Sequence, residues 1–356
     1  MRSPLFQFTI SLALLCIIGW LFVIGRSLLV PFIIALILWY IINSLSEALR
    51  STPYLGRYLP KYLTIFLALC LIFYGLTWVF SIVTANLQQL AQDAPTYQMR
   101  LDQVLGEISE HLKLNQRLAL TDILPNFSIS GALSLGAGLL TSLAGSSTLV
   151  FIYVLFMILE ANTFDKKVEA FFDDAKNAKL ATAIRSEIAR RMRHYIGIKT
   201  AISITTGFAT YFWLTFVGLE YAALFGFLAF LLNYIPTIGS LIAVVFPSLL
   251  ALVFFEDLAK FLLVSVGLGG IQFTLGSIID PRLMGTRLNI SPLVIMLSLS
   301  FWGSIWGVIG MVLCIPLMVL VIIICAQFPQ SRWIAILLSG NGEVGEPILK
   351  RGQSDT

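Results

Sequence analysis

Charged residues are scarce in this sequence. Aspartate, glutamate, lysine and arginine make up 12% of its 356 residues, about half of the usual share in a soluble domain. Apolar residues make up 58%, and several apolar runs reach the roughly 20 residues that a helix needs to cross a membrane. Alternating segments of about 10 residues, typical of transmembrane barrels, do not occur. The expected fold is therefore an all-α polytopic membrane protein.

Cysteine and histidine are also scarce. The four cysteines lie in apolar runs without Cys-x-x-Cys spacing and are expected to act as small hydrophobic residues: Cys16, Cys70, Cys314 and Cys325. The two histidines have no second ligand nearby for a metal site. The sequence contains no phosphate loop, HExxH motif or nucleophile and base set. We therefore expect neither an enzyme nor a cofactor, and the net charge of +4 indicates membrane topology and not nucleic-acid binding.

The apolar runs divide the chain into segments. We expect N-terminal spanning helices in 1–84, an extracytoplasmic amphipathic segment in 85–130, and a spanning helix rich in small residues in 131–160. A basic amphipathic segment in 161–199 precedes a transport core in 200–326 and a cytoplasmic tail in 327–356. The six expected spans are 5–25, 27–45, 62–84, 131–159, 196–218 and 261–279.

The distribution of charge predicts the orientation. Residues 160–199 carry nine of the 23 basic residues, so this segment is expected in the cytoplasm. The segment 85–130 carries five acidic against three basic residues and should lie outside. Both termini are then cytoplasmic. An apolar stripe allows the basic segment to lie on the inner membrane face, although it could equally be a solvated helix: Ile184, Ile188, Met192 and Tyr195.

Two apolar runs are too long for one crossing. The run 221–254 has 34 residues, and cutting it at Pro236 to Gly239 gives two pieces of about 14 residues, neither of which would span alone. The run 289–326 is interrupted by SFWGSIWGVIG at 300–310. We interpret both as re-entrant helical hairpins of opposite orientation, a design typical of transporters. The alternative is a pair of long, kinked helices.

Four blocks resemble the autoinducer-2 exporter family of bacterial inner-membrane proteins. They are KTAISITTG (199–207), LLNYIPTIGSLIAVVFP (231–247), DPRLMG (280–285) and LSLSFWGSIWGVIGMVLCIPL (297–317), with weaker similarity in VPFIIALI (30–37). The resemblance implies spanning helices with two hairpins, a homopentamer, and an elevator-like movement in each protomer. It also implies export of a furanosyl-type signalling molecule, with cation exchange in other members. An acidic residue before proline is typical of the family, and here it is Asp280.

The polar residues at the two interruptions are the candidate substrate-binding residues. Hydroxyl, amide and indole groups there suit a small polar ligand, although they could instead satisfy the turn backbone or pack in the core. Gln272 needs a polar partner within a span. Lys199 and Asp280 are candidates for ion coupling, with snorkelling or helix capping as the alternative. The substrate-binding candidates are Asn233, Tyr234, Pro236, Thr237, Gly239, Ser240, Gln272, Ser298, Ser300, Trp302, Gly303 and Trp306.

Three functions compete. The leading hypothesis is a secondary exporter of a small polar molecule such as an autoinducer-2-like signal. A sodium or other cation/proton antiporter on the same fold would need a titrating carboxylate, for which Asp280 is the candidate. A pentameric pore or scaffold without alternating access is the third. The expected partners are the substrate, the lipid bilayer and other copies of the chain.

Overall fold

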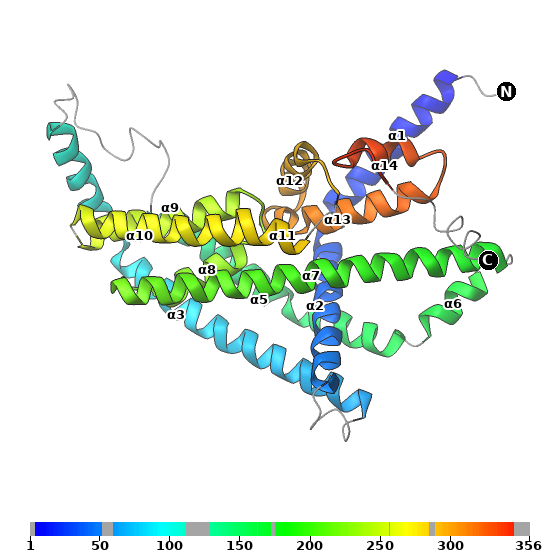
Figure 1. Ribbon diagram of the computed structural model, residues 1–356, viewed down its shortest axis with the longest axis horizontal. Coiled ribbons are helices and arrows are strands. Elements are labelled where there is room, and N and C mark those ends of the chain that lie inside the picture. The colour runs from blue at the N-terminus through cyan, green and yellow to red at the C-terminus, as the bar shows by residue number, and fades with distance from the viewer. Residues whose placement is uncertain are drawn as a thin grey trace. The chain divides into compact units, whose positions relative to one another are not determined.

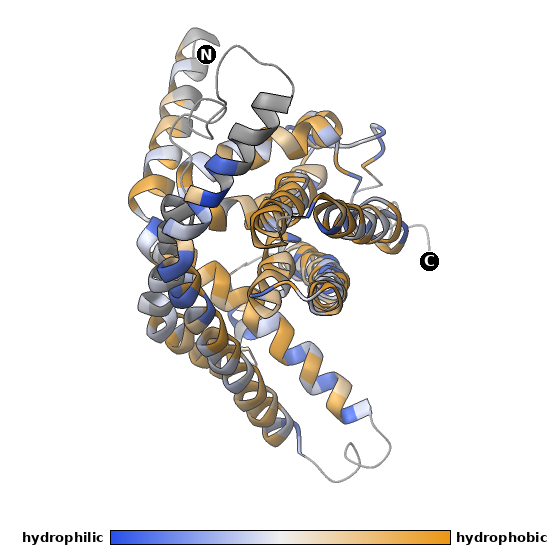
Figure 2. Ribbon diagram, turned by 90° about the vertical axis from the view of Figure 1, so that its left-hand side faces the viewer, coloured by the Kyte–Doolittle hydropathy of each residue, from blue (hydrophilic) through white to orange (hydrophobic). Residues whose placement is uncertain are grey.

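The computed structural model describes residues 4–51, 60–111, 129–161, 163–171, 175–255, 257–284 and 289–344 (Figure 1). Regular structure in these ranges is helical, apart from one isolated bridge between Ile290 and Ser339. Six helical stretches in the described part are long and apolar enough to cross a membrane: 26–51, 61–100, 178–217, 238–255, 258–284 and 308–327. Much of the helical ribbon consists of hydrophobic residues (Figure 2), and many large hydrophobic side chains are exposed, such as Phe66, Phe212 and Val266. The protein is therefore an all-α, multi-pass membrane protein, as predicted.

The chain forms two compact units. Unit 1 comprises residues 1–44, 146–196 and 286–356, and unit 2 comprises 45–145 and 197–285. The helices α2 (Arg26–Ser51), α5 (Ile129–Glu160) and α7 (Ala175–Val217) contribute residues to both units.

Unit 1 contains α1 (Pro4–Ile24), α6 (Phe164–Phe171), α12 (Pro292–Trp306), α13 (Val308–Gln327) and α14 (Arg332–Leu338). The predicted break between the first two spans is confirmed, because α1 ends at Ile24 and α2 begins at Arg26. The segment expected to be a tail folds back onto its own unit. There α14 packs on α13, and Ser291 N donates to the Leu338 carbonyl at 3.0 Å.

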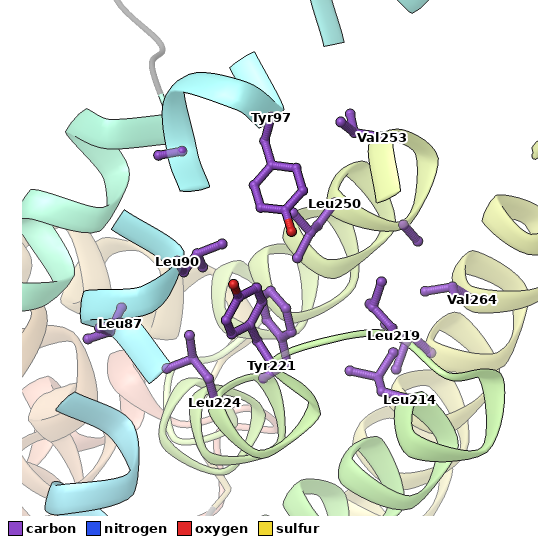
Figure 3. Packing of buried hydrophobic residues seen from close by; sticks show 14 of the residues in the cluster. Leu87, Leu90, Tyr97, Leu214, Leu219, Tyr221, Leu224, Leu250, Val253 and Val264 are labelled. Atoms are coloured by element: carbon purple, nitrogen blue, oxygen red, sulfur yellow. The ribbon is translucent and has the colours of Figure 1, made fainter. Parts of the chain in front are cut away.

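Unit 2 contains α3 (Lys61–His111), α8 (Ala222–Leu232), α9 (Ile238–Phe255), α10 (Leu258–Gln272), the π-helix η1 (Phe273–Ile279) and α11 (Asp280–Met284). Its buried core joins α3, the end of α7 and the helices from α8 to α10. Leu90, Leu224 and Leu268 in this core are at most 1% exposed. Two tyrosine rings lie among these leucine and valine side chains (Figure 3).

The run 221–254 turns back on itself. A turn separates α8 from α9, and the ring centroids of Phe225, near the start of α8, and Phe246, in the middle of α9, lie 5.9 Å apart. The halves are unequal, with 11 and 18 residues, and not two pieces of about 14. Moreover, α9 alone reaches the length of a membrane span. The expectation that neither piece is long enough to span a membrane alone is therefore wrong for α9.

The second run has the same form. Helix α12 ends at Trp306, and Gly307 adopts a φ of 65° before α13 begins. Ser298 Oγ in α12 donates to the Cys314 carbonyl in α13 at 3.3 Å, which places the two helices antiparallel. Both runs are thus helical hairpins and not single kinked helices. Their re-entrant position in a bilayer remains a prediction.

Two charged segments extend spanning helices without interruption. Helix α3 continues for 51 residues from the third expected span into the segment expected to be extracytoplasmic, through Pro95. Helix α7 joins the basic segment to the fifth expected span over 43 residues. At 1.5 Å per residue, each helix is about twice as long as a bilayer core is thick. The sequence boundaries at 84 and 199 therefore lie inside continuous helices.

Candidate functional site

A line of buried polar residues runs along α7 in unit 2. Lys199, Ser203, Thr206 and Thr210 recur at i, i+4, i+7 and i+11, which places them on one face of the helix; we call them the α7 seam. Each is at most 6% exposed. Phe208, Phe212 and Phe216 on the outer side of the same helix are 59 to 79% exposed. A helix with an apolar outer face and a polar inner face is suited to line an internal site within a membrane.

The first hairpin presents two of its predicted site residues to this part of α7. Asn233 Nδ2 donates to Ser203 Oγ at 2.9 Å, and the Tyr234 hydroxyl donates to Thr200 Oγ1 at 2.8 Å. Asn233 and Ser203 are both buried. These groups therefore join the end of α8 to α7, and a ligand at this point would compete with these hydrogen bonds.

Close backbone packing holds the two helices together. A Cβ on Gly207 would lie 2.8 Å from the Gly226 carbonyl oxygen, and one on Gly226 would lie 2.8 Å from Tyr211 Cβ. Real Cβ atoms do not approach this closely. Glycine at both positions therefore lets α8 approach α7 closely, as small residues do in membrane helix pairs.

The hairpin turn itself explains the remaining residues of LLNYIPTIGS. Thr237 has a φ of 61°, in the left-handed region that β-branched residues rarely adopt. A Cβ at Gly239 would lie 1.8 Å from the Leu232 carbonyl oxygen, so the reversal requires glycine there. Ser240 Oγ donates to the Thr237 carbonyl at 2.9 Å. Thr237 is exposed and Pro236 is half-buried, and strain of this kind is often found at functional sites.

The two candidate coupling residues form an ion pair. Lys199 Nζ lies 2.6 Å from Asp280 Oδ2, and the two side chains are only 7% and 16% exposed. Asp280 begins α11 at the end of the π-helix η1. Its second oxygen, Oδ1, is buried and has no hydrogen-bond partner among the described residues. Lys199 is thus held within the unit, so snorkelling to the surface does not describe it.

Three further polar atoms in unit 2 are buried without a hydrogen-bond partner among the described residues. They are Thr210 Oγ1 and Trp213 Nε1 on α7 and Gln272 Oε1 at the end of α10. Thr206, in contrast, donates to the Ile202 carbonyl at 2.9 Å. An unpaired buried polar group is destabilising. A polar ligand that formed hydrogen bonds with these atoms, in the interior of unit 2, would therefore bind favourably.

The predicted residues of the second hairpin lie in unit 1. Trp306 Nε1 donates to the Phe22 carbonyl at 3.0 Å, and the Phe22 ring meets both Trp302 and Trp306 edge-on. Ser300 Oγ donates to the Met296 carbonyl at 3.1 Å. A Cβ on Gly303 would lie 3.0 Å from the Met311 side chain. These contacts are typical of a packed aromatic cluster at the turn of α12 and α13, and they already occupy the Trp306 donor.

The structure therefore groups Asn233, Tyr234, Gln272, Lys199 and Asp280 within unit 2, and places the residues of the second hairpin in unit 1. Sequence reasoning did not identify the hydroxyls of the α7 seam. Their signal is the spacing of polar residues in KTAISITTGFAT, which recurs every three or four residues in an otherwise apolar helix.

Comparison with known proteins gives consistent matches over most of the chain. A family described as "AI-2E family transporter" matches residues 10–330. The AI-2 transport protein TqsA of Escherichia coli (strain K12) is 31% identical over 88% of this chain and 90% of its own length. A putative transport protein of Haemophilus influenzae is 29% identical over 88% and 91%, and the putative transport protein YhhT of Escherichia coli is 26% identical over 82% of each chain.

Proposed function

We propose that the chain, which belongs to the AI-2E family of transporters, exports a small, uncharged polar molecule across the bacterial inner membrane. The family and the six apolar helices make the chain a multi-pass membrane transporter and not an enzyme. The name of the relative TqsA suggests AI-2 as the substrate to test first.

The observation that carries the proposal is the α7 seam with the groups that face it. A transport site for a polar solute needs hydrogen-bonding groups buried inside an apolar protein, and these are costly unless they have a use. Unit 2 gathers hydroxyl, amide and indole groups of this kind from α7, α8 and α10, with one ion pair in which the charges offset each other.

The two hairpins support an elevator-like movement as the transport mechanism. In such a movement a compact core carries the site across the membrane, so that the site opens first to one side and then to the other. The close contact of α8 with α7 at Gly207 and Gly226 would let the first hairpin move with the site as one body. A homopentamer, suggested by family resemblance, would provide the fixed frame.

The test is transport by the purified protein in proteoliposomes. AI-2 loaded inside should exchange with external AI-2, and liposomes without protein should not support this exchange. Asn233→Leu, which removes the hydrogen bond to Ser203, should lower the exchange rate about tenfold if binding weakens by about 1.4 kcal/mol. No AI-2 exchange by correctly assembled wild-type protein would contradict the proposed substrate.

Cation/proton antiport is the second candidate, favoured by the buried pair of Lys199 and Asp280. A carboxylate with one free oxygen inside an apolar unit can bind a cation or a proton. In proteoliposomes with a pH gradient, added sodium should then dissipate the gradient in the wild type, and Asp280→Asn should abolish this effect. Dissipation that is independent of sodium, or that is retained by Asp280→Asn, would contradict this candidate.

A further inference from the structure

We infer that Thr210, Trp213 and Gln272 form a binding site for an uncharged, hydroxyl-bearing ligand between α7 and α10. The inference rests on the proposed function for its choice of ligand. It assigns Thr210 and Trp213, which sequence analysis did not select, to the same site as Gln272.

Helix α7 is aligned with α10 and with the segments that follow α10. A Cβ on Gly267 would lie 2.1 Å from Trp213 Nε1, so the indole of α7 lies directly on α10 at this glycine. At the other end, Lys199 meets Asp280 at 2.6 Å. The residue numbers increase along one helix as they decrease along the other, so the helices are antiparallel. The stretch of about 14 residues from Lys199 to Trp213 therefore lies alongside the stretch of about 13 residues from Gly267 to Asp280.

Gln272 lies between the two contacts that define this alignment. Gln272 lies five residues after Gly267, which lies beside Trp213. Because the helices are antiparallel, Gln272 lies at the level of α7 about five residues before Trp213, between Gly207 and Thr210. Gln272 also follows Val264 and Leu268 at four-residue intervals, and all three are buried. The Gln272 side chain therefore faces the interior of unit 2, at the level of Thr206 and Thr210 in the α7 seam.

The three unpartnered atoms differ in their hydrogen-bonding chemistry. Gln272 Oε1 can only accept a hydrogen bond, Trp213 Nε1 can only donate, and the Thr210 hydroxyl can do both. A ligand hydroxyl both donates and accepts, and so it complements this set. A bare cation does not, because the indole N–H presents positive charge toward the site. Thr210 and Gln272 are 1% and 6% exposed, so burial would strengthen each hydrogen bond formed there.

The surroundings of these three residues favour a neutral ligand. Gln272 is the residue immediately before η1, and single-turn π segments often occur at functional sites. Among the described residues, the unit's buried ion pair, Lys199 with Asp280, lies eight residues further along from Gln272, and its two charges offset each other. The site itself therefore favours a neutral compound with several hydroxyl groups, such as a furanose.

The test measures thermal stability of the purified protein with and without ligand. The variants are Thr210→Val and Gln272→Leu, and the control is Thr205→Val, whose hydroxyl is exposed on the same helix and donates to the Ala201 carbonyl. The probes are AI-2, D-ribose and sodium chloride. Without ligand, both variants should unfold at a higher temperature than the wild type, because each loses a buried atom that has no partner.

With AI-2 or D-ribose, the wild type and Thr205→Val should be stabilised, and each site variant should need about tenfold more ligand for the same shift. Equal affinity in the wild type and both site variants would overturn the inference. If the two variants fail to fold, Trp213→Phe decides, because it keeps an aromatic ring at this position and removes the donor. Wild-type affinity in that variant would overturn the inference.

Ligand binding and AI-2 exchange together distinguish failure of the proposed site from failure of the proposed substrate. If the wild type binds a furanose at this site but does not exchange AI-2 in proteoliposomes, the proposed substrate fails and the site stands. If AI-2 is exchanged at the wild-type rate by Thr210→Val and Gln272→Leu, the site fails and the proposed function stands.

Discussion

Individual hydrogen bonds hold the turn between α7 and α8 to α3. The Tyr221 hydroxyl donates to Asp93 Oδ2 at 2.6 Å, while Tyr97 donates to Glu220 Oε2 at the longer distance of 3.3 Å. Tyr221 is 7% exposed and sits at the left-handed residue before α8. Burial, together with the bond to Asp93, raises the pKa of Tyr221, so this donor stays protonated well above neutral pH.

Tyr221→Phe should therefore lower the free energy of unfolding by about 1.5 to 3 kcal/mol, as expected for a hydrogen bond to a charged group. Tyr97→Phe removes the longer bond and should have a smaller effect. Thermal unfolding in detergent would measure both variants. Equal losses of stability would mean that the short bond to Asp93 has no special role.

The pair of Lys199 and Asp280 leads to a second prediction at this scale. Lys199→Met or Asp280→Leu should each destabilise the protein by about 3 kcal/mol, because each leaves one charge buried without a partner. The double variant should recover most of that loss, and a double-mutant cycle measures the coupling. Additive losses in the double variant would show that the pair does not interact.

At the scale of elements, two glycines determine how closely α8 approaches α7. Gly226→Ala places a Cβ 2.8 Å from Tyr211 Cβ and 2.9 Å from the Gly207 carbonyl oxygen, so it should lower stability by about 1 to 3 kcal/mol through overpacking. Gly270→Ala is the matched control within α10, since nothing lies within 4 Å of its added Cβ.

That control should leave stability unchanged or raise it by up to about 1 kcal/mol, since alanine favours a helix. The unfolding temperatures of both variants, measured in the same detergent, provide the comparison. A Gly226→Ala protein as stable as Gly270→Ala would mean that α8 can move away from α7 without cost.

The sequence predicted where elements begin and end better than which elements meet. The interruption at Pro236 and Gly239 correctly indicated a hairpin. Proline alone did not identify it, since Pro247 and Pro316 lie inside continuous helices; the glycine that allows a close reversal made the difference. Hydropathy could not reveal that Asn233 meets Ser203, because that contact depends on how two helices pack 30 residues apart in sequence.

The same limit applies to the candidate site. Lys199 and Asp280 were each singled out as ionisable residues beside apolar segments, but their pairing across 81 residues depends on the alignment of α7 with α10. Thr206 and Thr210 were missed because threonine is common in membrane helices and its hydroxyl can bond to its own backbone. Only burial on a face shared with Lys199 distinguishes them.

At the scale of the whole molecule, the distribution of charge predicts sidedness. In a variant lacking the four native cysteines, Lys179→Cys should react with a membrane-impermeant thiol reagent only from the cytoplasmic side. Gln103→Cys, in the acidic segment, should react only from outside. Both positions are exposed. Labelling of intact cells and of inverted vesicles makes the comparison, and reaction of both residues from one side would contradict the expected topology.

The π-helix between Gln272 and Asp280 has a consequence for changes in chain length. Its hydrogen bonds span five residues instead of four, so the segment holds more chain per turn than an α-helix. Deleting one residue from 273–279 would allow an ordinary α-helix to form there. Each residue of an α-helix turns by about 100°, so Asp280 would rotate away from Lys199. A homologue lacking that residue would need its acidic side chain at a neighbouring position, so gaps in this segment and shifts of the carboxylate should be inherited together.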